Sequence, residues 1–232
     1  GTELSGLLSA LSTVPGDYWI RMFYCYPNSF TDEVLEVMAS DPRFCRYLDM
    51  PFQHISDPVL KKMNRKITRK EIEATMSRVR SQLPDVAWRT TFIVGFPTET
   101  DQDFEELVDF VSEGHFQHLG IFLYSDEDNI RSSKFGDPIP LSLKEERKNR
   151  LMEIQQKISR EHHQKMVGSL QQVLVGGFSS ETDLLLEGRN QYQGPEVDGV
   201  VYINEGNATS AGFHQVEITE AHEYDLVGKI LN

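Results

Sequence analysis

Cysteine is scarce in this 232-residue sequence, which contains only Cys25 and Cys45. A framework of several disulfides is therefore excluded, and the composition is typical of a reducing, cytoplasmic compartment. Two thiols also cannot supply the four sulfur ligands of a thiolate metal site or of an iron–sulfur cluster. We therefore expect no such cluster on this chain alone.

Long apolar runs are absent as well. No stretch approaches the roughly 20 apolar residues of a membrane span, and no charged segment followed by an apolar one marks a secretory signal. Hydrophobic residues make up 39% of the chain and aromatic residues 10%, which is enough for an apolar core. We expect a soluble globular protein with no membrane partner.

Positive charge is in short supply, and the deficit is uneven. The formal net charge is −13, and residues 167–232 contain ten acidic residues against two basic ones, a balance of −8 that leaves −5 for the first 166 residues. Such an acidic segment repels phosphate backbones and attracts a cationic partner. It also favours solubility, and composition leaves both explanations open.

The first two-thirds of the chain alternate strand-like with helix-like segments. The expected strands are 18–27, 45–54, 89–94 and 118–125, and the expected helices are 31–40, a short one opening at Asp57, 68–83, one from about residue 100, and 142–166. The expected helix caps are Thr31, Thr68 with Glu71, Thr100 with Asp103, and Ser142 with Glu145. The alternation predicts an α/β fold with parallel strands and right-handed crossovers.

After residue 166 the pattern changes. The segments 171–178, 183–190, 199–204 and 214–231 are strand-like runs separated by glycine-rich turns. They predict a small antiparallel barrel or sandwich. We place the boundary near Val167, which gives an α/β domain over 1–166 and an all-β domain over 167–232.

Residues at the expected strand ends combine aromatic and polar groups, and in parallel α/β folds ligands bind at those ends. The most legible stretch is "RTTFIVGFPTE" (89–99), where an apolar strand stops at Gly95. A glycine allows a ligand to approach the backbone closely. Pro97 would keep Phe96 extended, with its ring available to a planar heterocycle such as adenine. A tight strand-to-helix turn explains the same residues, and the two explanations remain open.

Three segments carry a family resemblance. "CRYLDMPFQHISDPVLKKMNRKITRKE" (45–71), "RTTFIVGFPTETDQDFEELVDF" (89–110) and "FLYSDED" (122–128) resemble the radical S-adenosylmethionine methylthiotransferases. Within that family, "RTT" before "FIVGFP", together with "GPEVDG" (194–199), is similar to the branch that modifies ribosomal protein S12. The resemblance implies that residues 1 to about 165 are the later strands of an incomplete TIM-like radical SAM barrel, and that 167–232 is a TRAM domain.

The resemblance also implies the chemistry of the parent protein. In the family, a 4Fe-4S cluster reduces S-adenosylmethionine to a 5′-deoxyadenosyl radical, which abstracts hydrogen from an unactivated carbon. Sulfur from a second 4Fe-4S cluster is then inserted, and a second S-adenosylmethionine supplies the methyl group. In the S12-modifying branch the target is the β-carbon of an aspartate. The implied partner is ribosomal protein S12, and a contact with ribosomal RNA is a further expectation.

One departure from the family pattern is decisive. The CxxxCxxC triplet of the radical-generating cluster is absent, and so is the N-terminal domain that binds the second cluster. Both would precede Gly1, so we expect the chain to be an inert piece of a longer protein. A smaller departure is the lack of the family's glycine–threonine pair near Asn129 and Ile130. Cys25 replaces an aliphatic residue and is expected to pack.

Carried over residue by residue, the resemblance implies cofactor contacts from nine positions. They are Gln53, His54, Arg89, Thr91, Gly95, Phe96, Pro97, Tyr124 and Ser125. A surface ion pair would equally explain Arg89, and a hydrogen-bonded core histidine would explain His54.

Two other functions compete with this one. "KKMNRKITRK" (61–70), with six basic residues in ten, favours a tRNA-modifying methylthiotransferase, although a solvated helix face looks the same. The second competing function is that of a non-enzymatic adaptor that binds ribosomal protein. Cysteine triplets upstream in the gene would exclude this function. Within "GPEVDG", Glu196 and Asp198 share one side if the stretch is extended. We predict that they bind a basic residue of S12, the alternative being an exposed connection between strands.

Overall fold

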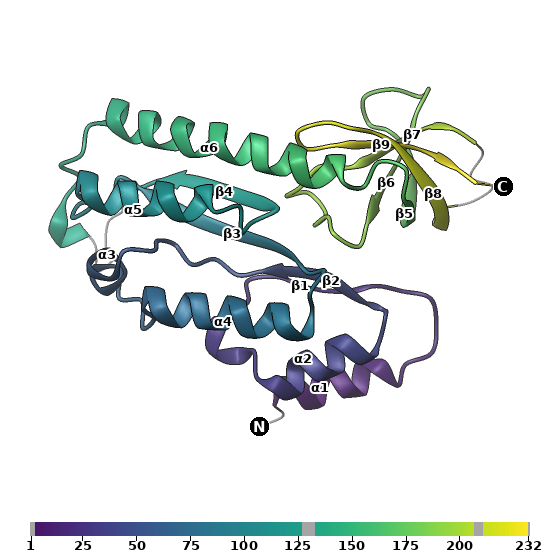
Figure 1. Ribbon diagram of the computed structural model, residues 1–232, viewed down its shortest axis with the longest axis horizontal. Coiled ribbons are helices and arrows are strands. Elements are labelled where there is room, and N and C mark those ends of the chain that lie inside the picture. The colour runs from purple at the N-terminus through teal and green to yellow at the C-terminus, as the bar shows by residue number, and fades with distance from the viewer. Residues whose placement is uncertain (1–2, 127–132, 207–210, 232) are drawn as a thin grey trace. The chain divides into compact units, whose positions relative to one another are not determined.

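The computed structural model describes residues 3–126, 133–206 and 211–231 (Figure 1). The chain divides into two compact units, one formed by Gly1–Phe44 with Leu48–Gln155 and the other by Cys45–Tyr47 with Gln156–Asn232. In the described ranges, no helix combines the length and the apolar character needed to cross a membrane.

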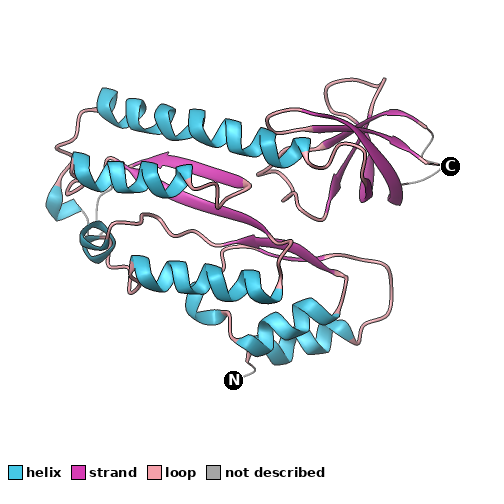
Figure 2. Cartoon of the chain, in the orientation of Figure 1, coloured by secondary structure: helices cyan, strands magenta, loops and turns pink. Residues whose placement is uncertain are grey.

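The first unit is built on a four-stranded sheet with the strand order β1-β2-β3-β4. Its strands are β1 (Ile20–Met22), β2 (Phe44–Asp49), β3 (Ala87–Val94) and β4 (His118–Leu123). Its helices are α1 (Leu4–Ser12), α2 (Asp32–Ser40), α3 (Asp57–Lys62), α4 (Arg69–Gln82), α5 (Asp101–Ser112) and the first part of α6 (Leu141–Gln164), with single 3-10 turns at Pro27–Ser29 and Ser133–Phe135. The pairs β1–β2 and β3–β4 are parallel, and helices separate the strands along the chain (Figure 2), which confirms the predicted α/β pattern.

The apolar core of this unit lies against one face of the sheet. On β3, Trp88, Phe92 and Val94 are completely buried. The helices add the predicted stripes, which are Ile72, Met76 and Val79 of α4 and Phe104, Leu107, Val108 and Val111 of α5. Burial of each large apolar side chain contributes about 1.5–3 kcal/mol, so this face provides most of the favourable free energy of folding.

Two of the four expected helix caps are confirmed as capping boxes. Thr68 and Thr100 each accept the backbone N–H three residues later, and the Glu71 and Asp103 carboxylates bond back to the cap. Thr31 occupies the cap position of α2 without a side-chain cap bond. The expected cap at Ser142 is wrong, because α6 begins earlier and the Pro140 carbonyl accepts the first N–H groups.

Two further expectations need correction. The strand expected over 18–27 covers only Ile20–Met22, because the chain turns at Tyr24 with φ +54°. The strand expected over 45–54 ends at Asp49. Helix α1 was not predicted, although Leu4, Leu7, Leu8 and Leu11 have the helical spacing that would have indicated it.

The second unit contains a closed five-stranded barrel with the order β5-β6-β7-β9-β8. Its strands are β5 (Leu170–Phe178), β6 (Leu186–Asn190), β7 (Val201–Glu205), β8 (Gly212–Ala221) and β9 (Leu226–Ile230). Alternate residues fill the interior, namely Val173, Val175, Val201, Ile203, Val216, Ile218, Leu226 and Ile230. The predicted all-β domain is therefore a barrel, but it is not wholly antiparallel, because β7 and β9 pair in parallel.

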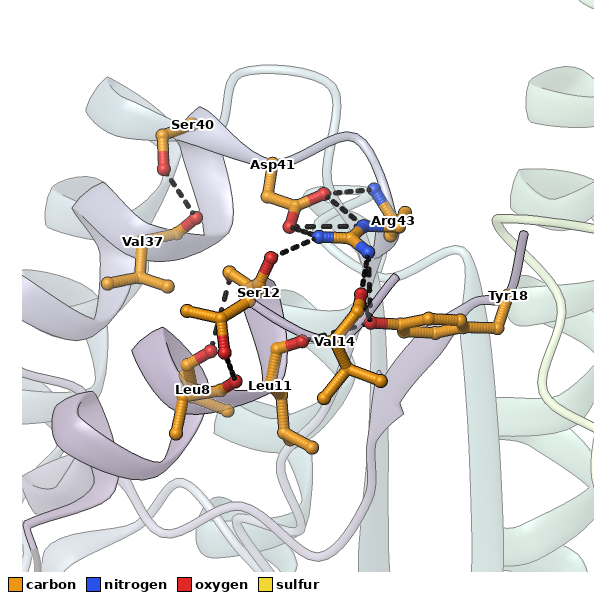
Figure 3. A network of polar contacts seen from close by, with 11 residues as sticks. Leu8, Leu11, Ser12, Val14, Tyr18, Val37, Ser40, Asp41 and Arg43 are labelled. Atoms are coloured by element: carbon orange, nitrogen blue, oxygen red, sulfur yellow. Dashed lines mark hydrogen bonds and ion pairs between the residues drawn. The ribbon is translucent and has the colours of Figure 1, made fainter. Parts of the chain in front are cut away.

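Arg43 ties the segment after α1 to the turn before β2 (Figure 3). Its Nη2 donates to the Ser12 carbonyl at 2.6 Å, and its Nη1 donates to the Val14 carbonyl at 2.6 Å and to the Tyr18 hydroxyl at 2.9 Å. Nε and Nη2 also bind the Asp41 carboxylate, at 3.0 and 2.7 Å. One planar guanidinium thus binds the carbonyl of the last residue of α1 and that of Val14 just beyond the helix.

We expect Arg43→Gln to lower the urea midpoint of unfolding and to make it less sensitive to acid. The hydrogen bond from Arg43 holds the pKa of Asp41 well below its usual range. A carboxyl whose folded pKa is depressed contributes stability that is complete above the unfolded value, about 3.9, and is lost as pH falls toward the folded one. The wild type should therefore lose more stability than Arg43→Gln between pH 6 and pH 3.

The matched control is Arg160→Gln, which removes an exposed arginine paired with Glu223 at 3.2 Å. If both variants show the same midpoint at pH 6, Arg43 does not stabilise the fold beyond an ordinary surface pair.

Candidate ligand-binding face of the parallel sheet

The second face of the sheet carries polar and exposed residues on β3 and β4. Arg89, Thr91 and Ile93 alternate along β3 and stand in register with His118, Gly120 and Phe122 of β4. Of these six residues only Thr91 is buried, and the Phe122 side chain is 60% exposed. Parallel sheets are normally covered on both faces, so an accessible polar face indicates a surface that binds something.

Asp49, the last residue of β2, forms an ion pair with Arg89 on this face. Arg89 Nη1 lies 3.0 Å from Asp49 Oδ1, and the exposed fractions of the two side chains are 14% and 1%. The same nitrogen lies 3.5 Å from the Thr91 hydroxyl. Burial of a charge is costly unless the charge is paired, so each partner holds the other in place.

Two non-glycine residues beyond the strand ends have left-handed backbone conformations. Tyr24, after β1, has φ +54°, and Gln53, after β2, has φ +74°. The Tyr24 N–H donates to Asp49 Oδ2 at 3.0 Å. The Gln53 N–H donates to the Thr91 carbonyl at 2.9 Å, and the Gln53 carbonyl accepts the Ile93 N–H at 2.8 Å. Such conformations cost about 1–3 kcal/mol each and cluster at functional sites.

His54 lies in a buried polar network. Its side chain is completely buried, and its Nδ1 accepts the Ser56 N–H at 3.0 Å, so the ring proton lies on Nε2. That nitrogen is 3.5 Å from Glu99 Oε2. Glu99 also accepts the Gly95 N–H at 2.9 Å and the Arg147 guanidinium at 2.6 Å. In this arrangement His54 supports the turn after β3.

Gly95 is required by a lysine of α6. It has φ +76°, and a Cβ at this position would lie 2.3 Å from Lys144 Cγ. The Lys144 stem is fixed, because its Nζ donates to the Tyr124 carbonyl at 2.7 Å and also binds Asp137. The close approach expected of a ligand is thus made by Lys144, and a ligand is not needed to explain the glycine.

The Phe96 ring is buried in an aromatic cluster. Its centroid lies 5.2 Å from that of Tyr124 and 6.0 Å from that of Phe135, both at steep angles. The Phe96 carbonyl accepts the Glu99 N–H at 2.8 Å, which closes the turn. The ring and the carbonyl that we expected to face a heterocycle are therefore both engaged within the protein.

The structure brings only part of the predicted set together. Arg89 and Thr91 lie on the accessible face of β3, and the Gln53 backbone bonds to β3 at Thr91, whereas His54 and Phe96 are buried. Pro97 is half-buried in the turn, and Ser125 is exposed just after β4. The positions near Asn129 and Ile130 fall outside the described residues. Cofactor contact by these residues stays a prediction.

Sequence reasoning missed Asp49 and Lys144. A carboxylate inside the apolar run "YLDMPF" was the available signal, because a buried charge in such a strand needs a partner. No local sequence feature distinguishes Lys144 from the other charged residues of its helix.

The prediction that Glu196 and Asp198 share one side required residues 194–199 to be extended. These residues form a turn instead. Asp198 N–H donates to the Gly194 carbonyl, and Asp198 Oδ2 accepts the Gly194 N–H at 2.7 Å. The same oxygen accepts the hydroxyl of Tyr47, a residue that groups with the second unit, at 2.7 Å. Glu196 is exposed with φ +66°. The two carboxylates therefore have different surroundings.

Neither cysteine lies in a metal-binding arrangement. Over the described ranges, no group of three or more histidine, cysteine, aspartate or glutamate side chains could hold a metal ion. Burial, followed by the nearby Asp49 charge, raises the pKa of the Cys25 thiol to about 12. Cys25 is thus a protonated thiol packed beside the core, as its sequence context predicted.

Comparison with known proteins matches two family models. The radical SAM superfamily model matches residues 6–111, and the TRAM domain model matches residues 167–231. The chain is also 48% identical over 225 residues to the ribosomal protein uS12 methylthiotransferase RimO of Bdellovibrio bacteriovorus, covering 97% of this chain and 49% of that protein. The protein of the same name from Myxococcus xanthus is 45% identical, with 99% and 48% covered.

The chain therefore carries a radical SAM domain over residues 6–111 and a TRAM domain over residues 167–231. It is similar, over nearly its whole length, to the uS12 methylthiotransferases. The chain spans about half the length of the curated relatives it matches.

We expect Gly95→Ala to lower the free energy of unfolding by about 1–3 kcal/mol, because the new methyl group strains the backbone and collides with the fixed Lys144 stem. In a Lys144→Ala background the collision is gone, so the same change should cost less. Urea unfolding of the four proteins of this double-mutant cycle measures the difference.

Gly114→Ala is the matched control, because Gly114 has φ +74° and no atom within 4 Å of an added Cβ. The loss of unfolding free energy in this variant measures the cost of the left-handed backbone conformation alone. Equal costs at Gly95 and Gly114 would show that the Lys144 contact is not the reason for the glycine.

Proposed function

We propose that the complete gene product is a radical SAM methylthiotransferase that adds a methylthio group to the β-carbon of an aspartate in ribosomal protein uS12. This chain supplies the later strands of its cofactor-binding sheet, the closing helix and the TRAM domain. The identity of 48% and 45% to uS12 methylthiotransferases, over 97% and 99% of the chain, supports this function.

The accessible face of the sheet is the observation that carries the proposal. S-adenosylmethionine has a carboxylate and an amino group at one end and adenosine at the other. The Arg89 guanidinium offers a planar donor pair for the carboxylate. Gly120 leaves the neighbouring position on β4 without a side chain, and the exposed Phe122 ring offers an apolar surface at the end of the same strand. These residues fit the cofactor, which when bound supplies the radical and the methyl group.

The iron–sulfur clusters do not fit residues of this chain. The described residues contain no group of three metal-ligating side chains, and Cys25 holds its proton. We therefore assign no step to a cluster here. The ligands of two 4Fe-4S clusters would come from the part of the curated relatives that this chain does not span.

The second unit favours a cationic partner. Of its two basic residues in 167–232, Lys229 is already paired with Glu217 at 3.3 Å. Burial and the surrounding carboxylates of Asp225, Glu181 and Glu187 raise the pKa of Tyr202 on the barrel. This negative potential supports ribosomal protein uS12 as the partner. A TRAM domain also suggests RNA binding, so a ribosomal RNA contact belongs to the same proposal.

The two acids of the "GPEVDG" turn have separate roles in this proposal. Asp198 holds the turn together through Gly194, whereas Glu196 is exposed and available to a lysine or arginine of uS12. The basic run at 61–70 is the feature that favours tRNA instead.

The first test is the activity of the complete gene product after anaerobic cluster reconstitution. We expect mass spectrometry to find methylthio-aspartate in uS12 and no modified adenosine in tRNA. Modification of tRNA alone would replace this proposal with the tRNA-modifying function, and a gene without upstream cysteine triplets would favour the adaptor.

We also expect the present chain to bind uS12 with an affinity that falls as salt rises, since the Debye length shortens to about 8 Å near physiological ionic strength. Glu196→Gln should weaken binding at low salt, whereas Glu153→Gln, at an exposed position of α6, should not. Binding that ignores salt and both changes would contradict an electrostatic contact at Glu196.

A further inference from the structure

Asp49 is a buried residue whose two carboxylate oxygens and backbone carbonyl oxygen are all engaged as acceptors. Oδ1 accepts Arg89 Nη1 at 3.0 Å, Oδ2 accepts the Tyr24 N–H at 3.0 Å, and the backbone carbonyl accepts the Cys25 N–H at 2.8 Å. The residue therefore joins the end of β2 to β3 on one side and to the turn after β1 on the other.

Stability of the fold does not explain this charge. The apolar core is built from the opposite face of the sheet, through Trp88, Phe92 and Val94. A buried ion pair is weak evidence for stability, because apolar side chains of similar volume often serve as well or better. What a carboxylate provides here, and an apolar residue does not, is a fixed direction for its hydrogen-bond donors.

The Arg89 guanidinium is the first group that Asp49 directs. Nη1 faces Asp49 on β2, while Nη2 lies 3.6 Å from the point that a Cβ on Gly120 of β4 would occupy. The planar group thus extends across β3 at the accessible face, with 14% of its side chain exposed. Its position on a strand rather than a loop keeps that geometry rigid.

The backbone of Tyr24 is the second group. Its N–H is bound by Asp49 while its φ is +54°, and its side chain is 82% exposed. A left-handed tyrosine persists only when its surroundings determine it, and the Asp49 bond is one such determinant. Tyr24 lies just beyond β1 and Asp49 is the last residue of β2, whereas Arg89 lies near the start of β3 on the accessible face.

We propose that Asp49 is a positioning residue that aligns the Arg89 guanidinium with the carboxylate of an α-amino-acid ligand at this face. The inference deepens the proposed function, in which that ligand is S-adenosylmethionine. Asp49 does not touch the ligand itself. It acts by holding Nη1 of the guanidinium, which fixes the orientation of the planar group.

The test compares two ligands that differ only in the carboxylate, S-adenosylmethionine and its decarboxylated form. Binding is measured by equilibrium dialysis to the complete gene product, reconstituted anaerobically and kept without reductant. Asp49→Asn should weaken binding of S-adenosylmethionine about 10- to 100-fold, the loss of one charge-assisted hydrogen bond. Affinity for the decarboxylated form should not change.

Arg89→Gln should reproduce the same selective loss, and the double variant should lose nothing further, because the two residues act through one contact. If Asp49→Asn does not fold, Arg89→Lys keeps the positive charge beside Asp49 and removes the planar fork. It should show the same discrimination between the two ligands.

Equal losses for both ligands, or no loss for either, would overturn the positioning role and leave the proposed function intact. Unchanged affinity for S-adenosylmethionine in both Arg89 variants would also overturn the positioning role and leave the proposed function intact. If the wild-type protein binds neither ligand, the proposed function fails, and this inference fails with it.

Discussion

The buried Glu99 carboxylate is the constraint on which the geometry of the site depends. It accepts the Gly95 N–H at 2.9 Å, the Arg147 guanidinium at 2.6 Å and faces His54 at 3.5 Å. Three segments distant in sequence therefore meet at one group: the chain after β2, the turn after β3 and helix α6. Because buried charges tolerate few arrangements, this contact fixes where β3 ends and where Lys144 crosses Gly95.

The two faces of the parallel sheet serve different purposes. One is apolar and closed, with Trp88 and Phe92 completely buried, and its burial stabilises the first unit. The other carries Arg89, Gly120 and the exposed Phe122, so its residues cannot be accounted for by packing. Rigid strands hold the polar groups, which is the arrangement that a binding site requires. The barrel of the second unit adds negative charge, which is the feature that favours a cationic partner in the proposed function.

The local sequence pattern was sufficient to predict the helices and strands, but it did not predict the roles of the residues at the strand ends. The boxes at Thr68 and Thr100 were predictable, because a cap needs only residues three apart. His54 and Phe96 were predicted as ligand contacts from the family resemblance and from the aromatic and polar residues that follow a strand, and that role stays a prediction. Their burial depends on α3, α5 and the segment at Phe135, which lie elsewhere in the sequence. Asp49 was passed over for the same reason, since its partners are 25 and 40 residues away.

The sequence by itself determined the α/β pattern, the all-β character of the second domain, the acidic charge of residues 167–232 and the family resemblance that the comparisons confirmed. Each of these depends on composition, on periodicity or on short motifs, all of which are local. Only the tertiary structure decided that Gly95 accommodates Lys144, that Asp49 holds Arg89 and Tyr24, and that Asp198 is engaged inside its turn. Those outcomes depend on which side chains come into contact after the chain has folded, and the spacing of residues along the sequence does not determine such contacts.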